Sequence, residues 1–337
     1  MRIGQNPARR SIPAYSPQRL GVASLVYIPM LQGYFEQMLA VVEIHLRSLR
    51  ENTAEPFDLL VFDNASCDEV KDTLLGWQKE GLIDWLIASR HNLGKTGALN
   101  WIIGGMPNEL ISYSDSDVLF RPGWLQTSLK ILNAFPQAGM ITAQPDFYPL
   151  VDGKMQAHLR LDPLEFETVE RMPSAQAVDE YVLGLGNKPL TRERIEGRPL
   201  QVLVNRANGA QAVIGATHMQ FLGRRSLLVQ ALPLPATLGL SPEEDQALDA
   251  RVDERGYLHL STLEPYVYHM GNQVDEIARR AAIQKPRSAE NKPARAILAE
   301  AGWGVRLLAR LARSATFKGF FLKLYNRLFQ IYSQSPK

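Results

Sequence analysis

The sequence has little cysteine, no long apolar run and almost no net charge. Cys67 is the single cysteine among 337 residues, which excludes an internal disulfide and fits a reducing compartment such as the cytoplasm. No apolar run has the length that a membrane crossing requires. Residues 1–18 contain Arg2, Arg9 and Arg10 but no apolar core, so they predict a disordered basic tail and no secretory signal.

The composition fits a large folded core, because 45% of the residues are apolar and the chain is long enough for one elaborated domain or two. Continuous apolar runs at Leu20–Ile28, Phe57–Phe62 and Ile83–Ala88, and a fourth ending at Asp115, are typical of buried strands. Helical spacing lies between them, at residues 35–49 and more weakly at 70–77. This alternation predicts an α/β fold with a parallel sheet flanked by helices.

The fourth run ends in Asp115-Ser116-Asp117. In an extended chain residues i and i+2 point the same way, so the two carboxylates could converge on one hard divalent cation, Mn²⁺ or Mg²⁺, with substrate phosphates completing its shell. The alternative is an ordinary turn, where aspartate and serine are common. Ligands of parallel sheets bind beyond the carboxyl ends of the strands, and Asp63 also falls there.

Several ordered motifs together resemble the family 2 glycosyltransferases of the GT-A fold over about residues 20–145. The motifs are Ile28-Pro29, Asp63-Asn64-Ala65-Ser66-x-Asp68, Asn92-x-Gly94-x-x-x-Ala98-x-Asn100, Asp115-Ser116-Asp117 and Pro122-Gly123-Trp124-Leu125. The resemblance implies a Rossmann-like, mostly parallel sheet and a nucleotide-diphosphate sugar as the donor.

The same resemblance implies roles for individual residues. Asp63 would accept a hydrogen bond from the nucleobase, Asp115 would contact the ribose, and Asp117 would ligate the cation. The full set expected at the donor is Pro29, Asp63, Asn64, Asn92, Gly94, Lys95, Asp115 and Ser116. An Asx-turn or helix cap remains the alternative for Asp63, and a plain surface lysine for Lys95.

Two later segments complete the predicted site. Glu244-Asp245-x-x-Leu248-x-x-Arg251 resembles the acidic helix start of the family, which makes Asp245 the expected general base, although acids also suit the first turn of a helix. His269 ends a predicted strand at 265–271 and resembles a third metal ligand, beside Asp115 and Asp117. No role is predicted for His45, His91, His158, His218 or His259.

The remaining sequence indicates how the chain is divided into segments. A GT-A domain over residues 19–275 would contain a proline-rich, irregular insertion at about 144–206, either a lid on the acceptor side or a decoration. Residues 276–337 would form a helical C-terminal region without an acid after Glu300, and residues 303–332 alternate cations with apolar side chains. That amphipathic segment suits an anionic membrane surface, or packing against its own domain or a second subunit.

These features predict a metal-dependent glycosyltransferase that moves a sugar from a nucleotide-diphosphate sugar to a hydroxyl acceptor, such as a cell-envelope glycan or a lipid-linked molecule. An inverting reaction needs the base, whereas a retaining relative of the same fold does not. A non-catalytic nucleotide-sugar-binding or scaffold protein is the alternative of a different class. We expect a cytoplasmic protein, which would be peripheral at the inner face of the cell membrane if the C-terminal segment binds lipid. Nucleic acid is not expected as a partner. A homo-oligomer is an open alternative.

Overall fold

The computed structural model describes residues 15–148, 162, 164–235 and 242–283, with only the backbone described at 242–246 and 282–283. Its first part alternates strands with helices as the apolar pattern predicts. The elements are β1 (Leu20–Val26), α1 (Met38–Asn52), β2 (Phe57–Asn64), α2 (Asp68–Glu80), β3 (Trp85–Ser89), α3 (Gly94–Gly105) and β4 (Leu110–Asp115). The helix α2 ends at Gly81, where a φ of 86° lets the N–H turn back to the carbonyls of Trp77 and Gln78.

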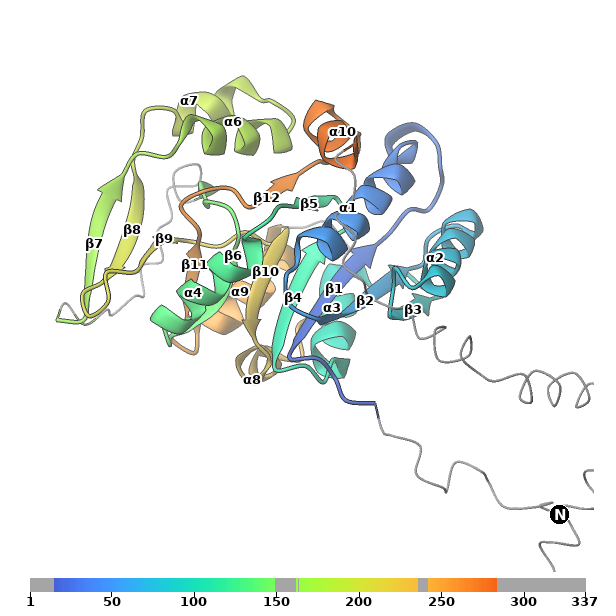
Figure 1. The fold of residues 1–337 in the computed structure, drawn as a ribbon, viewed down its shortest axis with the longest axis horizontal. Helices are drawn as coiled ribbons and strands as arrows, with labels where there is room; N and C mark the ends of the chain where they lie inside the picture. Colours follow the sequence, from blue (N-terminus) through green and yellow to red (C-terminus); the bar gives the residue numbers. More distant parts are fainter. Residues whose placement is uncertain (1–14, 149–161, 163, 236–241, 284–337) are drawn as a thin grey trace, which may run out of the picture. The chain divides into compact units, whose positions relative to one another are not determined.

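The second part contains more strands than helices. The elements are β5 (Val118–Phe120), α4 (Trp124–Ala134), β6 (Ala138–Thr142), β7 (Phe166–Arg171), α6 (Ala175–Gly184), α7 (Pro189–Ile195), β8 (Leu200–Asn205), β9 (Gln211–Ile214), β10 (Gln220–Arg224), α8 (Arg225–Leu228), α9 (Pro242–Asp253), β11 (Leu258–Ser261), β12 (Val267–His269) and α10 (Glu276–Ile283), with short 3-10 turns at Gly33–Phe35 and Val229–Ala231. Figure 1 shows their arrangement.

Ten of the described strands form one sheet in the order β3-β2-β1-β4-β10-β6-β11-β9-β8-β7. The first four are parallel, as expected for strands joined through helices, and β10 then runs antiparallel to both β4 and β6. The strands β8 and β9 are antiparallel because residues 206–210 are too short for a crossover. The α/β fold with flanking helices is confirmed, and the sheet is mixed.

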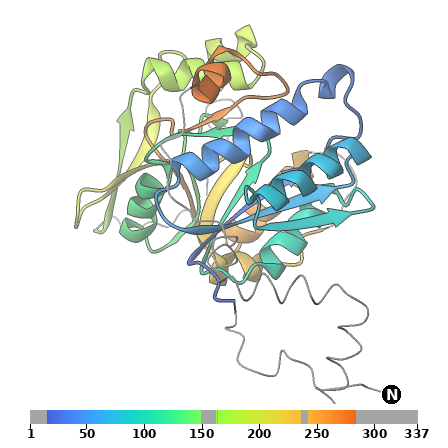
Figure 2. The same cartoon turned by 45° about the vertical axis from the view of Figure 1, so that its right-hand side comes forward.

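The two faces of the parallel strands pack against different helices. Val22 and Val61 face a cluster with α1, α2 and α4, whereas Ala23 and Phe62 face a cluster with α3 and α9. This follows from the alternation of side chains along a strand. Figure 2 shows α1 and α2 lying across the strands on one side of the sheet.

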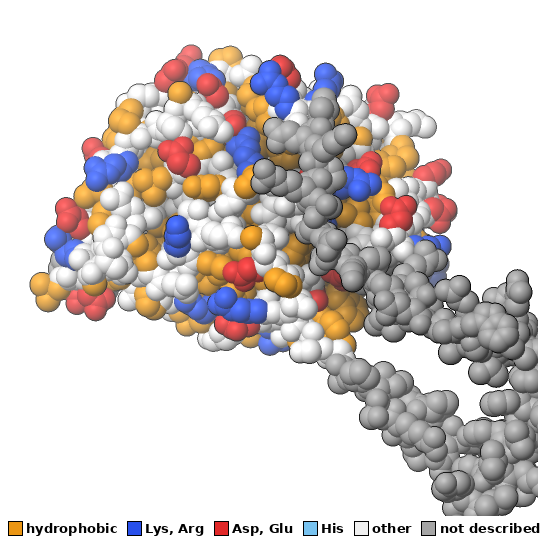
Figure 3. All heavy atoms as spheres, viewed as in Figure 1, with side chains coloured by type: hydrophobic (Ala, Val, Ile, Leu, Met, Phe, Trp, Pro, Cys, Tyr) orange, Lys and Arg blue, Asp and Glu red, His pale blue; other side chains and the backbone are white. Residues whose placement is uncertain are grey.

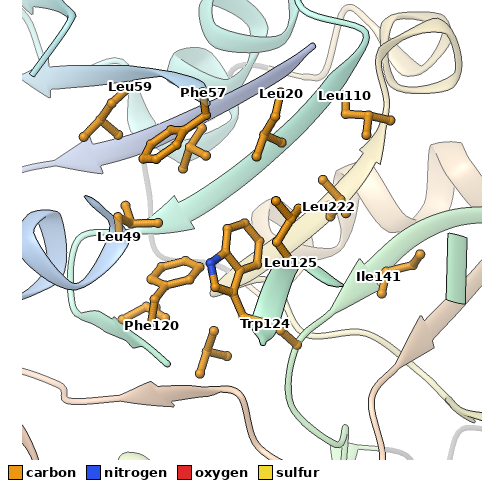
Figure 4. Packing of buried hydrophobic residues seen from close by; sticks show 14 of the residues in the cluster. Leu20, Leu49, Phe57, Leu59, Leu110, Phe120, Trp124, Leu125, Ile141 and Leu222 are labelled. Atoms are coloured by element: carbon orange, nitrogen blue, oxygen red, sulfur yellow. The ribbon is translucent and has the colours of Figure 1, made fainter. Parts of the chain in front are cut away.

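Trp124 anchors the core on the α1 side. It is fully buried, its ring meets the Phe120 ring edge to face at 4.8 Å, and its indole N–H donates to Thr53 Oγ1 at 3.0 Å. Leu49, Leu125 and the strand residues around them close the packing (Figure 4). Since burying a residue of this size contributes several kcal/mol, this cluster holds β5 and α4 against the sheet.

The expectation of an irregular insertion at 144–206 is wrong for residues 166–205, which hold β7, α6, α7 and β8. The prolines within residues 166–205 stand at or just before the starts of elements. Pro173 precedes the N-cap Ser174 of α6, Pro189 is the first residue of α7, and Pro199 precedes β8. Proline is tolerated at these positions because no backbone N–H is needed there.

The surface of the described part mixes both signs of charge. On the face drawn in Figure 3, basic and acidic side chains are interspersed with apolar ones wherever that face is not covered in grey. Among the helices of the described ranges, none is long and apolar enough to cross a membrane. The predicted tail at 1–14 and the amphipathic segment at 303–332 lie outside the described residues.

Candidate active site

The predicted site lies where the parallel strands end. The register pairs Val26 of β1 with Asp63 of β2 and Leu25 of β1 with Asp115 of β4, so the two aspartates flank the end of β1 at the same edge of the sheet. Asn64 is the last residue of β2, and Pro29 and Ser116 lie in the loops after β1 and β4. The topology therefore brings the first predicted residues to one edge, as α/β proteins do with ligand sites.

Asp63 is completely buried at this edge. Its Oδ1 accepts the N–H of Ser66 at 3.0 Å, and Ser66 Oγ accepts the N–H of Ile28 at 3.0 Å, which fastens the loop to the end of β1. Oδ1 therefore makes the kind of contact that the Asx-turn alternative for Asp63 predicts. Asp63 Oδ2 is buried and has no hydrogen-bond partner among the described residues.

Asn64 and Asn92 stabilise the loop that precedes α3. Asn64 Oδ1 accepts the N–H of Leu93 at 2.8 Å, and Asn64 Nδ2 donates to Asn92 Oδ1 at 3.0 Å. Asn92 Oδ1 also accepts the N–H of Gly94 at 2.9 Å, and Gly94 has a φ of 69°, a conformation that favours glycine. The two asparagines thus hold the start of α3, whose first N–H groups form the positive end of the helix dipole.

Lys95 is not a plain surface lysine. Its Nζ donates to Asp115 Oδ2 at 3.0 Å and to the carbonyl of His218 at 3.2 Å, and it lies 5.6 Å from the centre of the Tyr113 ring. Asp115 Oδ1 accepts the Tyr113 hydroxyl at 2.6 Å. Burial raises the pKa of Asp115 above its usual value, and the positive charge of Lys95 counteracts part of that rise.

His269 reaches Asp117 across a small two-stranded sheet. The antiparallel pair β5 and β12 sets His269 opposite Val118, and the N–H of Met270 donates to the Asp117 carbonyl at 2.8 Å. As a result His269 Nε2 lies 3.1 Å from Asp117 Oδ2, although 152 positions separate the two residues. Figure 1 shows β5 and β12 side by side, away from the large sheet.

Asp117 and His269 shift each other's titration. Burial alone would raise the pKa of Asp117, but the adjacent His269 imidazole lowers it below its usual value. Burial alone would lower the pKa of His269, but the Asp117 carboxylate raises it above its usual value. Asp117 Oδ1 is buried without a hydrogen-bond partner among the described residues. One oxygen of Asp117 thus faces the His269 imidazole, and the other has no partner in the described part of the chain.

The predicted set of Asp115, Asp117 and His269 is not assembled as three ligands. Within the described ranges, no three His, Cys, Asp or Glu side chains come together as metal ligands. The strand β4 ends at Asp115 and the chain turns at Ser116 and Asp117, so the two carboxylates do not project in parallel as they would in an extended chain. Asp115 instead faces Lys95 and Tyr113.

The predicted acidic helix is present as α9, which begins with Pro242 as the sequence indicates. Asp245 lies in its first turn, but its side chain is outside the described residues. One turn further along, Asp249 Oδ2 lies 3.3 Å from His218 Nδ1 and Asp249 Oδ1 lies 3.9 Å from His259 Nδ1. This cluster was not predicted, although the four-residue spacing from Asp245 to Asp249 puts both on one helix face.

Asp146 is a second residue that sequence reasoning missed. It is buried after β6, and burial raises its pKa to about 6, while the N–H of Tyr148, which donates to its Oδ1 at 2.9 Å, works against that rise. Gly215 gives it room, because a Cβ there would lie 2.4 Å from Asp146 Oδ2. Nothing in the local sequence indicates this contact.

His45 is the third missed residue, and here the sequence carried a signal. His45 occupies the apolar stripe of α1, between Val42 and Leu49, and is fully buried. Its Nδ1 donates to the carbonyl of Val118 at 2.6 Å and its Nε2 lies 2.6 Å from Ser24 Oγ. It thereby fixes the residue directly after Asp117.

The carboxyl ends of the parallel strands carry carboxylates, a lysine and the start of a helix. This arrangement is typical of α/β proteins that bind ligands at that edge of the sheet. Residues 31–182 match the profile described as Glycosyl transferase family 2. Residues 31–182 therefore match a family 2 glycosyltransferase domain, which confirms the resemblance drawn from the motifs in that part of the chain. Comparison with curated proteins finds no match.

Several solved structures are similar to this chain at low identity. S. aureus TarS 1–349 is 14% identical over 75% of this chain and 60% of its own, with a TM-score of 0.45. TarS 1–349 in complex with UDP-GlcNAc is 13% identical, with the same TM-score and coverage. Mannosyltransferase PcManGT from Pyrobaculum calidifontis, in complex with GDP-Man and Mn²⁺, is 16% identical over 96% of this chain and 89% of its own, with a TM-score of 0.44. This chain thus spans 60% of the length of TarS 1–349.

Proposed function

We propose that this protein is a metal-dependent glycosyltransferase that moves a sugar from a nucleotide-diphosphate sugar to a hydroxyl acceptor. The observation that carries the proposal is the meeting of Asp117 and His269, 3.1 Å apart, beside the Lys95–Asp115 pair at the ligand-binding edge of the sheet. The family 2 domain agrees with that chemistry. A scaffold protein would have no need for a buried carboxylate oxygen without a partner, because such an oxygen costs stability.

The donor would lie between the end of β1 and the start of α3. In this arrangement Asp63 Oδ2 accepts an N–H of the nucleobase, and Asp115, with lone pairs beyond those that Lys95 and Tyr113 use, accepts a ribose hydroxyl. The first N–H groups of α3 and the charge of Lys95 favour the diphosphate. The loops around the donor would be shaped by Pro29, Asn64, Asn92 and Ser116. The hydrogen bonds of Asn64 and Asn92 support this role for the two asparagines.

The residues present fit Mn²⁺ or Mg²⁺. Asp117 Oδ1 is a buried oxygen without a partner among the described residues, and His269 Nε2 is a borderline ligand that suits Mn²⁺. Asp117 and His269 would hold the ion, with diphosphate oxygens as further ligands. When bound, the ion neutralises the charge that grows on the departing diphosphate.

Asp245 would accept the proton of the acceptor hydroxyl. Asp245 lies in the first turn of α9, whose next turn lies beside His218. Lys95 donates to the His218 carbonyl, and this link supports a position of Asp245 near the donor. A base placed opposite the leaving diphosphate gives inversion at the anomeric carbon. The acceptor we favour is a cell-envelope glycan or a lipid-linked molecule, with residues 303–332 holding the protein at an anionic membrane surface on the cytoplasmic side.

The first test is to replace the carboxylate that carries the proposal. We expect Asp117→Ala to abolish Mn²⁺-dependent binding of UDP and GDP, measured by calorimetry with and without the metal, because the ion loses its main oxygen ligand. The matched control is Asp68→Ala, whose carboxylate is 95% exposed on α2 and should leave binding unchanged. Metal-dependent binding that persists in Asp117→Ala would contradict the proposed site.

A further inference from the structure

The helix α6 is fixed to the strand that carries His269. The hydroxyl of its N-cap, Ser174, donates to Glu264 Oε2 at 2.7 Å, three residues before β12 begins. In the middle of the helix, Glu180 receives two hydrogen bonds from Arg121, at 2.8 and 2.9 Å, and Arg121 also donates to the Pro265 carbonyl at 3.1 Å. Such a two-pronged pair with a buried glutamate is rigid.

The last residue of α6 touches His269 itself. A Cβ on Gly184 would lie 3.0 Å from both the Cβ and the carbonyl oxygen of His269. The same added Cβ would lie 3.5 Å from His269 Nδ1, so the ring also lies against the backbone of Gly184. Because Nε2 faces Asp117, Nδ1 is the ring nitrogen that lies next to the Gly184 backbone.

We propose that Gly184 is a positioning residue for His269, and that the Arg121–Glu180 pair holds α6 in the place where the Gly184 carbonyl can do this. A histidine that ligates a metal commonly donates its second ring N–H to a carbonyl or carboxylate, which fixes the direction of the ligating nitrogen. Here the carbonyl fixes Nε2 toward Asp117. The inference rests on the proposed metal-dependent function only for what Nε2 binds.

The backbone carbonyl cannot be removed, so the test uses the lack of a side chain. In the full chain, Gly184→Ala should displace the His269 ring by a few tenths of an ångström while suiting the helix. The matched control is Gly76→Ala in α2, a helical glycine with nothing within 4 Å of an added Cβ. Thermal unfolding verifies that both variants fold.

Two measurements follow. In metal-free, ¹⁵N-labelled wild-type protein, we expect a His269 Nδ1–H signal that exchanges slowly with water and shows cross-relaxation to the Hα protons of Gly184. Titration of Mn²⁺ in the presence of UDP, followed by electron paramagnetic resonance, should then give roughly 10- to 100-fold weaker binding for Gly184→Ala and unchanged binding for Gly76→Ala.

The outcomes separate this inference from the proposed function. If wild-type protein binds no Mn²⁺, the metal proposal fails, and the Nδ1–H signal still decides whether Gly184 holds the ring. Absence of that signal in the wild type, or Gly184→Ala binding Mn²⁺ like the wild type, would overturn the positioning role. The wild-type spectrum decides even where Gly184→Ala does not fold.

Discussion

At the scale of single residues, His45 links protonation to stability. Burial lowers its pKa from 6.5 to about 4, against the effect of its hydrogen bond to the Val118 carbonyl. The folded state therefore binds this proton less readily than the unfolded chain. The resulting stability is present above pH 6.5 and is lost as the pH falls toward 4.

This gives a prediction for His45→Gln, whose side chain does not titrate but can still donate to Val118 and accept from Ser24. At pH 7 we expect the variant to be less stable, because glutamine fills the site less well. The wild type should lose about 3 kcal/mol of this advantage between pH 6.5 and pH 4. Urea unfolding at several pH values measures both curves. Parallel curves would show that the pKa of His45 is not lowered by folding.

Asp245 carries the second prediction at this scale. Asp245→Asn keeps the shape of the side chain but cannot accept a proton, so donor binding should persist and transfer should fall by a factor on the order of 10² to 10⁴. Glu254→Gln, an exposed carboxylate just after the same helix, is the control and should transfer normally. NMR of the first-formed product gives the anomeric configuration. Retention of the donor configuration would exclude both the base and the inverting reaction.

The residues of the site could be predicted in part. Asp63, Asp115 and Lys95 were located from motifs, because strand ends and the residues after them are readable in a parallel α/β pattern. The direction of the Asp115 carboxylate could not be predicted, since it depends on where the strand stops and on Lys95, 20 positions away. The contact between Asp117 and His269 also depends on strand pairing, which no local pattern encodes.

At the scale of elements, a strand could be predicted from the sequence where its side chains are buried, because a buried strand gives a continuous apolar run. The strands β1 and β2 are buried along almost their whole length and read as continuous apolar runs. The strand β7 is an edge strand with mostly exposed side chains, and its FETVER sequence gives no apolar run. Its pairing with β8 depends on residues 29 or more positions away, so the part of the sheet beyond β11 could not be predicted.

Part of the segment predicted as an insertion supports the strand that carries His269. Its helix α6 packs against β12 through Gly184, and Arg121, in the turn between β5 and α4, ties the same helix to the carbonyl of Pro265. The segment predicted as a lid or decoration thus contains a structural support for the predicted metal ligand His269. This stretch folds into regular elements because α6, α7, β8 and β9 bury apolar side chains in one cluster.

At the scale of the whole molecule, the charge of the chain is distributed unevenly. The described unit has interspersed charges on the face of Figure 3, whereas the sequence after Glu300 contains no acid. Amphipathic segments with cations on one flank bind anionic lipid surfaces. The alternative, packing of this segment on protein, predicts no dependence on lipid charge.

The last prediction separates these alternatives in the full-length protein. Arg306, Arg310 and Arg313 replaced together by glutamine should weaken binding to phosphatidylglycerol liposomes roughly 100-fold, since each cation near such a surface contributes about 1 kcal/mol. The control replaces Lys79, Lys130 and Lys188, which are exposed in the described unit, so the net charge changes equally. Co-sedimentation at low and high salt measures binding. Donor binding should be unchanged in both variants, because neither variant replaces a residue proposed to bind the donor or the metal. Equal loss in both, or a wild type that does not sediment with liposomes, would contradict the membrane role of residues 303–332.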